Sequence, residues 1–475
     1  MRISRRRFLS GTLAAAATLQ PGSLGSQVVD PSALGFPDHA REWHGESSAA
    51  AARRMARRSS RFAGDVEPPV PVQPLDRSAI AAHLAARIPS LSRHFIFEYY
   101  AWYETAPYRH WNLFDREPPF DLAANYVPSL GAYDSRSTAV IEQHARWIAE
   151  LGVGAINVSW WGPGSRSDVI VPHVMDVMHA HDIRVTFHLE PYTDDRRGVY
   201  VRDILYLIEE YGEKRGWDAF LLLEHGDGTS GPVLKSFRTI LTSEVTDCHG
   251  VVHPVPDYTS DEAWRRETDR LRNILRPDFS RVVLLADSLD PLRTSTSGFD
   301  GIAIYDNFVL PATWPGHARE TRALDLYYSF NVNPGYDGIA LRNVAEGSCY
   351  RPTGFEPAGP PVEWSDVGSR EEAMRRSLNR IDESLDMTLR LQTEPSSANV
   401  RDGFFLVYLT SFNEWHEGHQ FEPMKHARDL TPGERGFGYH NPEDGGIRFR
   451  HLQRQLRPFL GRTSTADPPG GGIAS

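Results

Sequence analysis

The sequence predicts an α/β fold class: a single (β/α)8 TIM barrel that follows an N-terminal export signal and a linker. Between about residues 93 and 460, short runs rich in β-branched and aromatic residues alternate with longer segments of helical spacing. Several of these runs end in polar and aromatic clusters, as expected where barrel strands deliver side chains to one rim. No glycine-rich phosphate loop follows the first run, which favours a barrel over an open doubly wound sheet.

The first half of this body predicts three strands, each followed by a helix. The first of these helices has Ser137 as its expected N-cap and ends before Gly152. The third ends at Gly212 for the same reason. The strands are predicted at residues 94–100, 155–160 and 183–188, and the helices at residues 137–151, 168–181 and 200–211.

The second half predicts five further strands and two long helices. The strands are expected at residues 219–223, 282–286, 301–305, 325–331 and 403–410, and the helices at residues 260–275 and 370–391. Eight parallel strands can then be drawn, the number that a closed barrel of this type needs. Two separate sheet-based domains remain the alternative.

Composition limits the number of domains and the kinds of partner. The 475 residues would allow about three average domains, yet single barrels with insertions also run well beyond about 250 residues. With 51 basic and 62 acidic residues, the net charge of -11 leaves no basic excess for phosphates, so we expect no nucleic-acid partner. A content of 40% hydrophobic and 24% charged residues is typical of a globular protein, and we expect no stable membrane span.

The chain has two cysteines, Cys248 and Cys349. This number excludes a disulfide framework and a cysteine-only zinc cluster. One bridge between the two residues and a pair of free thiols both remain open.

The N-terminus has the pattern of a targeting signal. Residues 4–9, Ser-Arg-Arg-Arg-Phe-Leu, precede an apolar stretch over residues 11–19 that is too short for a permanent membrane helix. This resembles a twin-arginine export signal, while a chance basic N-terminus on a cytoplasmic protein is the alternative. We therefore expect the twin-arginine machinery as a partner, and a mature protein that is periplasmic, cell-wall-associated or extracellular.

The remaining boundaries follow from composition. Residues 1–30 are predicted to be the signal region and residues 31–90 a linker or N-terminal arm, since much of this segment is rich in Ala, Arg, Ser and Pro without apolar periodicity. Residues 91–462 are predicted to form the barrel domain. Residues 463–475, which contain a Pro-Pro-Gly-Gly-Gly run, are predicted to be a flexible tail.

The most informative segment for chemistry lies at residues 404–418. An apolar run leads into Ser-Phe-Asn-Glu-Trp-His-Glu-Gly, which places Glu414 and Glu417 three residues apart at a predicted strand end. In a cleft with aromatic walls, burial and mutual repulsion can keep one carboxyl protonated while the other is ionised, as acid and base catalysis requires. The alternative is that both glutamates cap or salt-bridge the loop.

Other chemistries have weaker support. His188, Glu190, His416 and Glu417 include good metal ligands, but no HExxH pair is present, so no metal site is predicted. Neither Ser159 nor Ser411 lies in a GxSxG turn, which disfavours acyl transfer.

Aromatic residues follow several of the predicted strands. Trp102, Trp160 and Trp415 stand beside Asn, Glu or His residues at strand ends. Their rings could pack in the core or stack on the faces of sugars, and both interpretations remain open.

Several separate segments resemble one family, the endo-acting α-mannosidases and α-mannanases of glycoside hydrolase family 99. The resemblance covers roughly residues 93–430, and its most specific motif is the one at residues 410–418. The other matching segments occur in the family's order and lie at residues 99–103, 133–136, 140–144, 158–160, 185–192, 297–301 and 334–336.

The resemblance implies a (β/α)8 barrel without a metal or other cofactor that cleaves within an α-linked mannose-containing oligo- or polysaccharide, with retention of configuration. It also implies that the 2-hydroxyl of the substrate attacks its own anomeric carbon to give a 1,2-anhydro sugar. Glu414 would be the base that assists this hydroxyl, and Glu417 the acid that protonates the leaving oxygen. The residues expected to bind substrate are Tyr100, Trp102, Trp160, His188, Glu190, Tyr192, Asn413 and His416.

The chain also departs from the family pattern. Residues 231–237 do not reproduce a tyrosine-rich stretch of the family, residues 306–308 replace an aromatic loop, and His419 and Phe421 change the residues after the main motif. Two alternatives therefore remain beside an exported endo-hydrolase. One is a noncatalytic carbohydrate-binding cell-envelope protein on a barrel scaffold, and the other is a transglycosylating relative.

Overall fold

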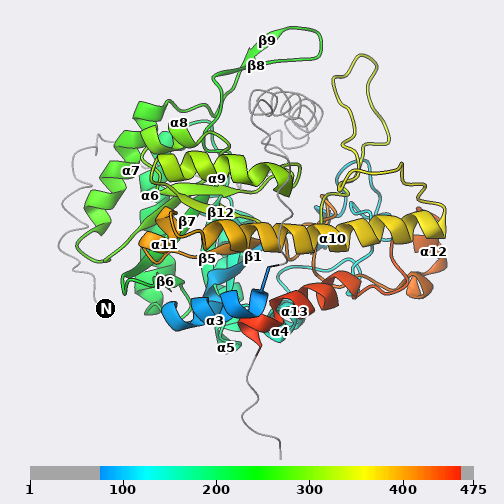
Figure 1. Ribbon diagram of the computed structural model, residues 1–475. Coiled ribbons are helices and arrows are strands. Elements are labelled where there is room, and N and C mark those ends of the chain that lie inside the picture. Colours follow the sequence, from blue (N-terminus) through cyan, green and yellow to red (C-terminus); the bar gives the residue numbers. More distant parts are fainter. Residues whose placement is uncertain (1–74, 462–475) are drawn as a thin grey trace, which may run out of the picture.

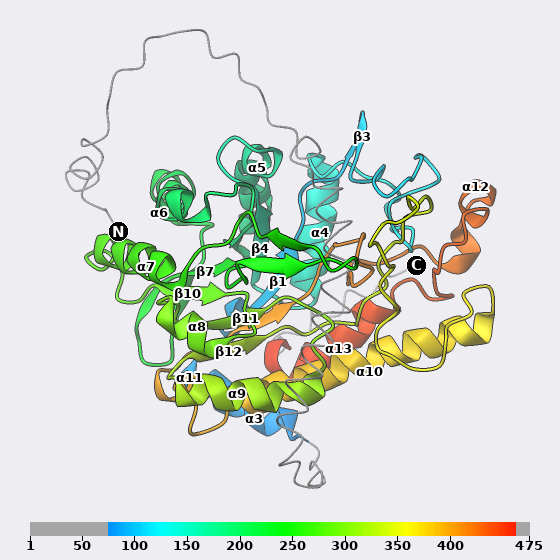
Figure 2. The ribbon, with the colours of Figure 1, turned by 90° about the horizontal axis from the view of Figure 1, so that it is seen from above.

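The computed structural model describes residues 75–461. The predicted signal region, the predicted tail and most of the predicted linker lie outside these residues. A ring of parallel strands occupies the centre, and helices surround it (Figure 1). The view from above shows the strands enclosed by this outer layer of helices (Figure 2).

Eight parallel strands make up the ring, and neighbours in chain order pair around it. Two backbone hydrogen bonds link the two end strands of the sheet. Val332 N–H donates to Tyr408 O at 2.8 Å, and Thr410 N–H donates to Val332 O at 2.9 Å. The predicted eight-stranded barrel is confirmed. The strands are β1 (Phe95–Tyr99), β4 (Ala155–Trp160), β5 (Arg184–Leu189), β7 (Ser230–Ser236), β10 (Val283–Ala286), β11 (Gly301–Ile304), β12 (Tyr327–Phe330) and β13 (Val407–Leu409).

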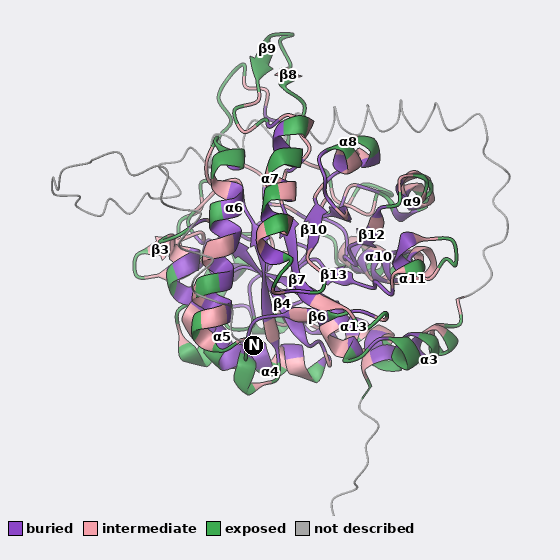
Figure 3. Ribbon diagram, turned by 90° about the vertical axis from the view of Figure 1, so that its left-hand side faces the viewer, coloured by how far each residue is buried: buried purple, intermediate pink, exposed green. Residues whose placement is uncertain are grey.

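Most of the helices lie around the outside of the ring, and their ribbons carry both buried and exposed residues (Figure 3). Several begin at a side-chain N-cap, such as Ser165, Asp195 or Ser260, whose oxygen accepts a backbone N–H of the first turn. No helix among residues 75–461 combines the length and apolar character that a membrane crossing needs. The helices are α3 (Arg77–Arg87), α4 (Thr138–Glu150), α5 (Arg166–Ala180), α6 (Arg196–Leu207), α7 (Asp261–Leu275), α8 (Pro291–Thr296), α9 (Trp314–Ala323), α10 (Val367–Gln392), α11 (Ala398–Arg401), α12 (Pro432–Arg435) and α13 (Ile447–Leu460).

Shorter elements decorate the ends of the barrel. Two antiparallel hairpins, β2 (Glu104–Thr105) with β3 (Tyr108–Arg109) and β8 (Glu244–Thr246) with β9 (Val252–Pro254), lie outside the ring. A π-helical turn at Ile208–Gly212 extends α6. The 3-10 turns are η2 (Leu91–His94), η4 (Glu213–Arg215), η5 (Pro311–Thr313) and η6 (Ala427–Asp429).

The fourth barrel strand differs from the prediction. Residues 219–223 make one parallel bridge, between Phe220 and Val185, and the chain then turns back through β6 (Leu222–Glu224). The ring position belongs to β7, which was not predicted because Gly231-Pro232 reads as a strand breaker. Gly231 is required there, since a Cβ at this position would lie 1.7 Å from Arg281 O.

The interior of the barrel changes character along its axis. Alternate residues of each strand point inward and outward. At the amino end the inward residues are apolar, among them Ile96, Val233 and Leu406. Near the carboxyl end they are charged, as the buried ion pair of Glu98 and Lys235 shows. The barrel therefore has an apolar base and a polar upper half.

Two features of the chain lie outside the ring. Helix α3 falls within the segment predicted to be a linker or N-terminal arm, and it buries Ala81 and Leu84 against the core. Its Arg77 Nε donates to Asp386 on α10 at 2.6 Å. Cys248 and Cys349 form a disulfide, which joins the β8–β9 hairpin to the long loop after β12.

We predict that His225 makes the fold sensitive to acid. This residue is buried between β6 and β7, and burial, with a contribution from Arg281, lowers its pKa to about 3. The unfolded chain titrates near 6.5 and so binds the extra proton between these values, which means that stability is full above about pH 6.5 and falls as the pH drops. His225→Leu should reduce the loss of unfolding free energy between pH 7 and pH 4 by about 2 kcal/mol.

Urea unfolding of the wild type and the variant at both pH values measures this difference. An identical pH dependence in the two proteins would contradict the assignment.

Candidate active site

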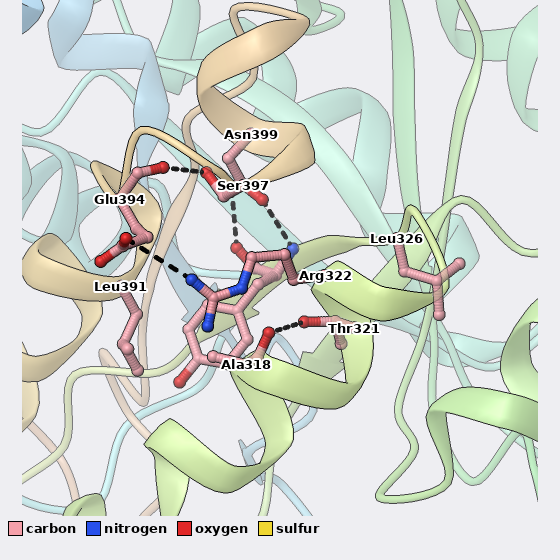
Figure 4. Close-up of a pocket in the computed structure, with 9 residues that line it drawn as sticks. Ala318, Thr321, Arg322, Leu326, Leu391, Glu394, Ser397 and Asn399 are labelled. Atoms are coloured by element: carbon pink, nitrogen blue, oxygen red, sulfur yellow. Dashed lines mark hydrogen bonds and ion pairs between the residues drawn. The ribbon is translucent and has the colours of Figure 1, made fainter.

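The carboxyl ends of the barrel strands bring together the side chains expected to carry chemistry. The loop over residues 410–419 leaves β13 and lies against the end of β1. The cavity in Figure 4 is a different feature, at the amino end of β12 between α9 and the α10–α11 segment. Its volume of about 30 Å³ suits a water molecule and not a sugar.

The loop is fixed to β1 by backbone and side-chain hydrogen bonds. Phe412 N–H donates to Glu98 O at 2.8 Å. The Asn413 side chain accepts from Tyr100 N–H through Oδ1 and donates to Tyr100 O through Nδ2, both at 2.8 Å. These contacts set the position from which Glu414 and Glu417 project.

Glu414 is enclosed, with a side chain that is 4% exposed. Its Oε1 accepts the backbone N–H of His416 at 2.9 Å and lies 3.1 Å from His416 Nδ1. Its own N–H donates to Ser411 Oγ at 2.8 Å. The carboxylate is therefore held by its own loop.

Glu417 is more open, with a side chain that is 20% exposed. Its Oε2 accepts the Tyr305 hydroxyl at 2.8 Å and lies 2.6 Å from His419 Nε2. Tyr305 in turn accepts the Tyr100 hydroxyl at 2.9 Å. The two carboxyl groups of the motif thus have different surroundings, which is the condition for different roles.

A buried ionic cluster lies beneath them. Lys235 Nζ donates to Glu98 Oε1 at 2.7 Å, and His188 Nδ1 lies 3.1 Å from Glu98 Oε2. Although burial acts to raise the pKa of Glu98, Lys235 and His188 lower it to about 2. Glu190 accepts from Ser159 Oγ at 2.8 Å, and burial raises the pKa of its carboxyl. This cluster forms the floor of the site. It combines the ionised Glu98 with Glu190, whose carboxyl is more easily protonated.

The predicted substrate-binding residues do not all lie alike. Trp102 is half-buried, stacks on His110 with ring centres 4.5 Å apart and lies 5.9 Å from the His416 ring. Its neighbour Trp161, from the end of β4, is also half-buried. Together with Tyr100, His188, Glu190 and His416, these rings and polar groups surround the motif and remain candidates for contact with sugar.

Trp160, Asn413 and Tyr192 need correction or refinement. Trp160 is fully buried, and its indole N–H donates to Asp168 on α5 at 2.7 Å, because its place in β4 points it outward, toward the helices. The Asn413 side chain is also fully buried, and it donates a hydrogen bond to the backbone carbonyl of Tyr100. The Tyr192 hydroxyl donates to Asp203 on α6 at 2.5 Å. Trp160 and Asn413 support the site from behind and do not line it.

Sequence reasoning missed Tyr305, His419 and Asp306 as members of the site. Tyr305 is the last residue of the predicted strand at 301–305, so the strand-end rule contained its signal. His419 was noted as a departure from the family, and its contact with Glu417 depends on the fold of the loop. Asp306 belongs to residues 306–308, which the sequence marks only as a departure from an aromatic loop of the family.

Among residues 75–461, one group of metal-ligand atoms converges, that of Cys248, His249 and Cys349. Its two sulfurs are joined in the disulfide. The four residues weighed from the sequence as a metal set do not form such a group.

Comparison with known proteins shows what this chain is similar to. The model of Glycosyl hydrolase family 99 matches residues 90–220. The glycoprotein endo-alpha-1,2-mannosidase of Mus musculus is 25% identical over 367 residues, which cover 68% of this chain and 66% of the mouse protein. The glycoprotein endo-alpha-1,2-mannosidase-like protein of Homo sapiens is 26% identical over 318 residues, which cover 64% of this chain and 58% of the human protein. The chain thus spans just under two thirds of the mouse relative that it matches.

A solved structure shares the architecture. The GH99 endo-alpha-mannosidase from Bacteroides thetaiotaomicron superposes with a TM-score of 0.53 over 78% of this chain and 98% of that chain, at 20% identity. At this identity the likeness shows the fold, which agrees with the barrel described above.

We predict that Asp306 weakens the fold as the pH rises. It follows Tyr305, and its Oδ1 accepts Phe308 N–H at 2.7 Å. Burial raises its pKa to about 7, and Asp287 and Glu417 add to the increase. Because an unfolded aspartate titrates near 3.8, the folded protein holds the extra proton between these values and loses stability as the pH climbs through them.

Asp306→Asn keeps the Oδ1 acceptor and removes the titrating group. The variant should exceed the wild type in unfolding free energy by roughly 2 kcal/mol at pH 8 and by little at pH 4. Denaturant unfolding at the two pH values tests this, and a variant with no advantage at pH 8 would refute it.

Proposed function

This chain belongs to glycoside hydrolase family 99, and on that premise we propose that it is an endo-acting hydrolase that cleaves α-mannoside linkages within a glycan. The relatives named above are described as endo-alpha-mannosidases or as similar to them. The observation that carries the proposal is the contrast between Glu414, which its own loop encloses, and Glu417, which is open and receives two polar partners. One motif thereby supplies a sheltered carboxylate and an accessible acid.

The proposed reaction proceeds through a 1,2-anhydro sugar. Glu414 accepts the proton of the substrate 2-hydroxyl while that oxygen attacks the anomeric carbon. The bond to the leaving oxygen breaks, and Glu417 supplies the proton which that oxygen takes up. The two carboxyl groups then need different protonation states at the start, ionised for Glu414 and protonated for Glu417.

The second half returns both groups to their starting state. Water attacks the anomeric carbon and gives its proton to Glu417, while the proton on Glu414 goes back to the 2-oxygen as the anhydro ring opens. Each half inverts the anomeric carbon, so the product retains its configuration. If an acceptor sugar replaces water, the same intermediate leads to transglycosylation.

The substrate is proposed to be an α-linked manno-oligosaccharide or polysaccharide. Half-buried indole faces at Trp102 and Trp161 offer surfaces for sugar rings, while Glu190 and His188 offer polar groups. Because the mouse relative is named for the α-1,2 linkage, that linkage is the first to test.

Glutamine variants of the two acids separate their roles. Glu414→Gln and Glu417→Gln should each lower the turnover of an α-mannan by about 1000-fold. With an α-mannobiosyl fluoride, whose leaving group needs no proton, Glu417→Gln should keep the first step, the release of fluoride, and Glu414→Gln should not. Chromatography of the sugar products measures turnover of the mannan, and a fluoride electrode measures the release of fluoride.

Glu434→Gln is the matched control. Glu434 is also buried, and it pairs with Lys425 in the capping box of α12. Full turnover in either catalytic-pair variant would reject the assignments, and sugar binding without turnover in the wild type would favour a noncatalytic carbohydrate-binding protein.

We also propose that the protein acts outside the bacterial cytoplasm after twin-arginine export. The residues Arg5-Arg6 with Phe8 support this, and the disulfide is of a kind that persists in oxidising compartments. Replacing Arg5 and Arg6 by lysine should leave the protein in the cytoplasm. Fractionation of cells that express either form tests this, and equal export of both would contradict it.

A further inference from the structure

His419 has no place in the proposed reaction, yet it contacts both parts of the motif. Its side chain is fully buried. Its Nε2 lies 2.6 Å from Glu417 Oε2, and its Nδ1 lies 3.0 Å from Ser411 Oγ. The same Ser411 oxygen accepts the N–H of Glu414 at 2.8 Å. The imidazole therefore bridges the turn that carries Glu414 and the carboxyl group of Glu417.

A turn at Gly418 makes this contact geometrically accessible. Gly418 has φ +66°, and a Cβ there would lie 2.2 Å from Asp337 O, so no other residue fits. The turn brings His419 back to the side of the loop on which Glu417 lies.

We assign the proton of the His419 ring to Nε2 from the partners of its two nitrogens. Ser411 Oγ accepts from Glu414, so its own proton is available for His419 Nδ1. The ring proton then resides on Nε2 and is donated to Glu417 Oε2. In this arrangement each donor has an acceptor.

Tyr305 donates to the same oxygen. Its hydroxyl accepts from Tyr100, which directs the Tyr305 proton toward Glu417 Oε2. A carboxylate oxygen has two lone-pair sites, and these two donors occupy both on Oε2.

We propose that His419 is a positioning residue for Glu417: together with Tyr305 it occupies Oε2, so that Oε1 carries the proton given to the leaving oxygen. The proposal rests on the proposed function of Glu417 as the acid. It also means that His419 stabilises the carboxylate left after the proton has gone.

The other titratable groups that face Glu417 come from several elements. Asp306 and Tyr305 follow β11 and Tyr336 follows β12, while Tyr100, after β1, and Glu414, on the same loop, interact with Tyr305. The neighbouring acids disfavour a second negative charge, and the donors His419 and Tyr305 oppose them. Loss of the His419 donor should therefore make Glu417 harder to ionise.

The test compares His419→Leu, which removes the donor, with His419→Gln, whose amide N–H2 can still reach Glu417. In His419→Leu, kcat on an α-mannan should fall at least about 10-fold with little change in KM, and the alkaline limb of kcat/KM should move up by about 1 pH unit. In His419→Gln the limb should stay within a few tenths of the wild-type value.

His225→Leu is the matched control, because it makes the same substitution at an equally buried histidine at the other end of the barrel. Its alkaline limb should not move. If His419→Leu does not fold, His419→Asn replaces it in the test, because the asparagine side chain is too short to reach Glu417.

A second measurement does not depend on turnover. The Glu417 carboxyl is titrated by 13C NMR in glutamate-labelled protein and assigned by the signal missing from Glu417→Gln. A pKa higher by about 1 unit in His419→Leu and unchanged in His419→Gln supports the proposal. Equal titration in all three proteins overturns it.

Failure of the proposed function and failure of the proposed role of His419 give different results. A wild type that cleaves no α-mannan rejects the proposed function, while the NMR titration still decides the role of His419. A wild type that cleaves, with His419→Leu showing the wild-type limb and titration, rejects the role of His419 alone.

Discussion

The joint between the first and last strands holds the site together. Asn413 makes a reciprocal pair of hydrogen bonds with the backbone of Tyr100, and Phe412 N–H donates to Glu98 O. Because β1 and β13 pair side by side, this joint is also where the chain positions the two carboxyl groups proposed to be catalytic. A displacement here would move Glu414 and Glu417 together, since both leave the loop within four residues of Asn413. The precision of the site is thus a consequence of barrel closure.

The charged floor follows from the same geometry. Inward positions near the carboxyl end hold Glu98 and Lys235 as a buried pair. A buried ion pair loses much of its attraction to desolvation, so its worth lies less in stability than in a fixed arrangement of charge. Breaking it by removing one partner would leave an uncompensated charge beneath His188 and Tyr305. The floor therefore constrains the orientation of His188 and Tyr305 in the site.

The sequence was sufficient for what depends on local pattern. Strands such as 155–160 lie where alternation and β-branched residues predicted them, and the Glu414–Glu417 motif was found at a strand end. The fourth strand was missed because Gly231-Pro232 is compatible with β7 only through its neighbours, which no local rule contains. Trp160 was assigned to the site because the register of β4, which decides between inward and outward, is set by packing. Contacts between distant residues, such as Tyr305 with Glu417, need the fold itself.

The spacing of the motif explains how one short loop creates two environments. Each glutamate is followed two residues later by a histidine that contacts it, His416 for Glu414 and His419 for Glu417. Glu414 accepts the backbone N–H of His416, whose ring packs beside the half-buried Trp102. The chain after Glu417 turns at Gly418 and buries His419 completely. A helix would place residues three apart on one face, in the same surroundings. The irregular loop separates them instead, and this separation supports the different roles proposed for the two carboxyl groups.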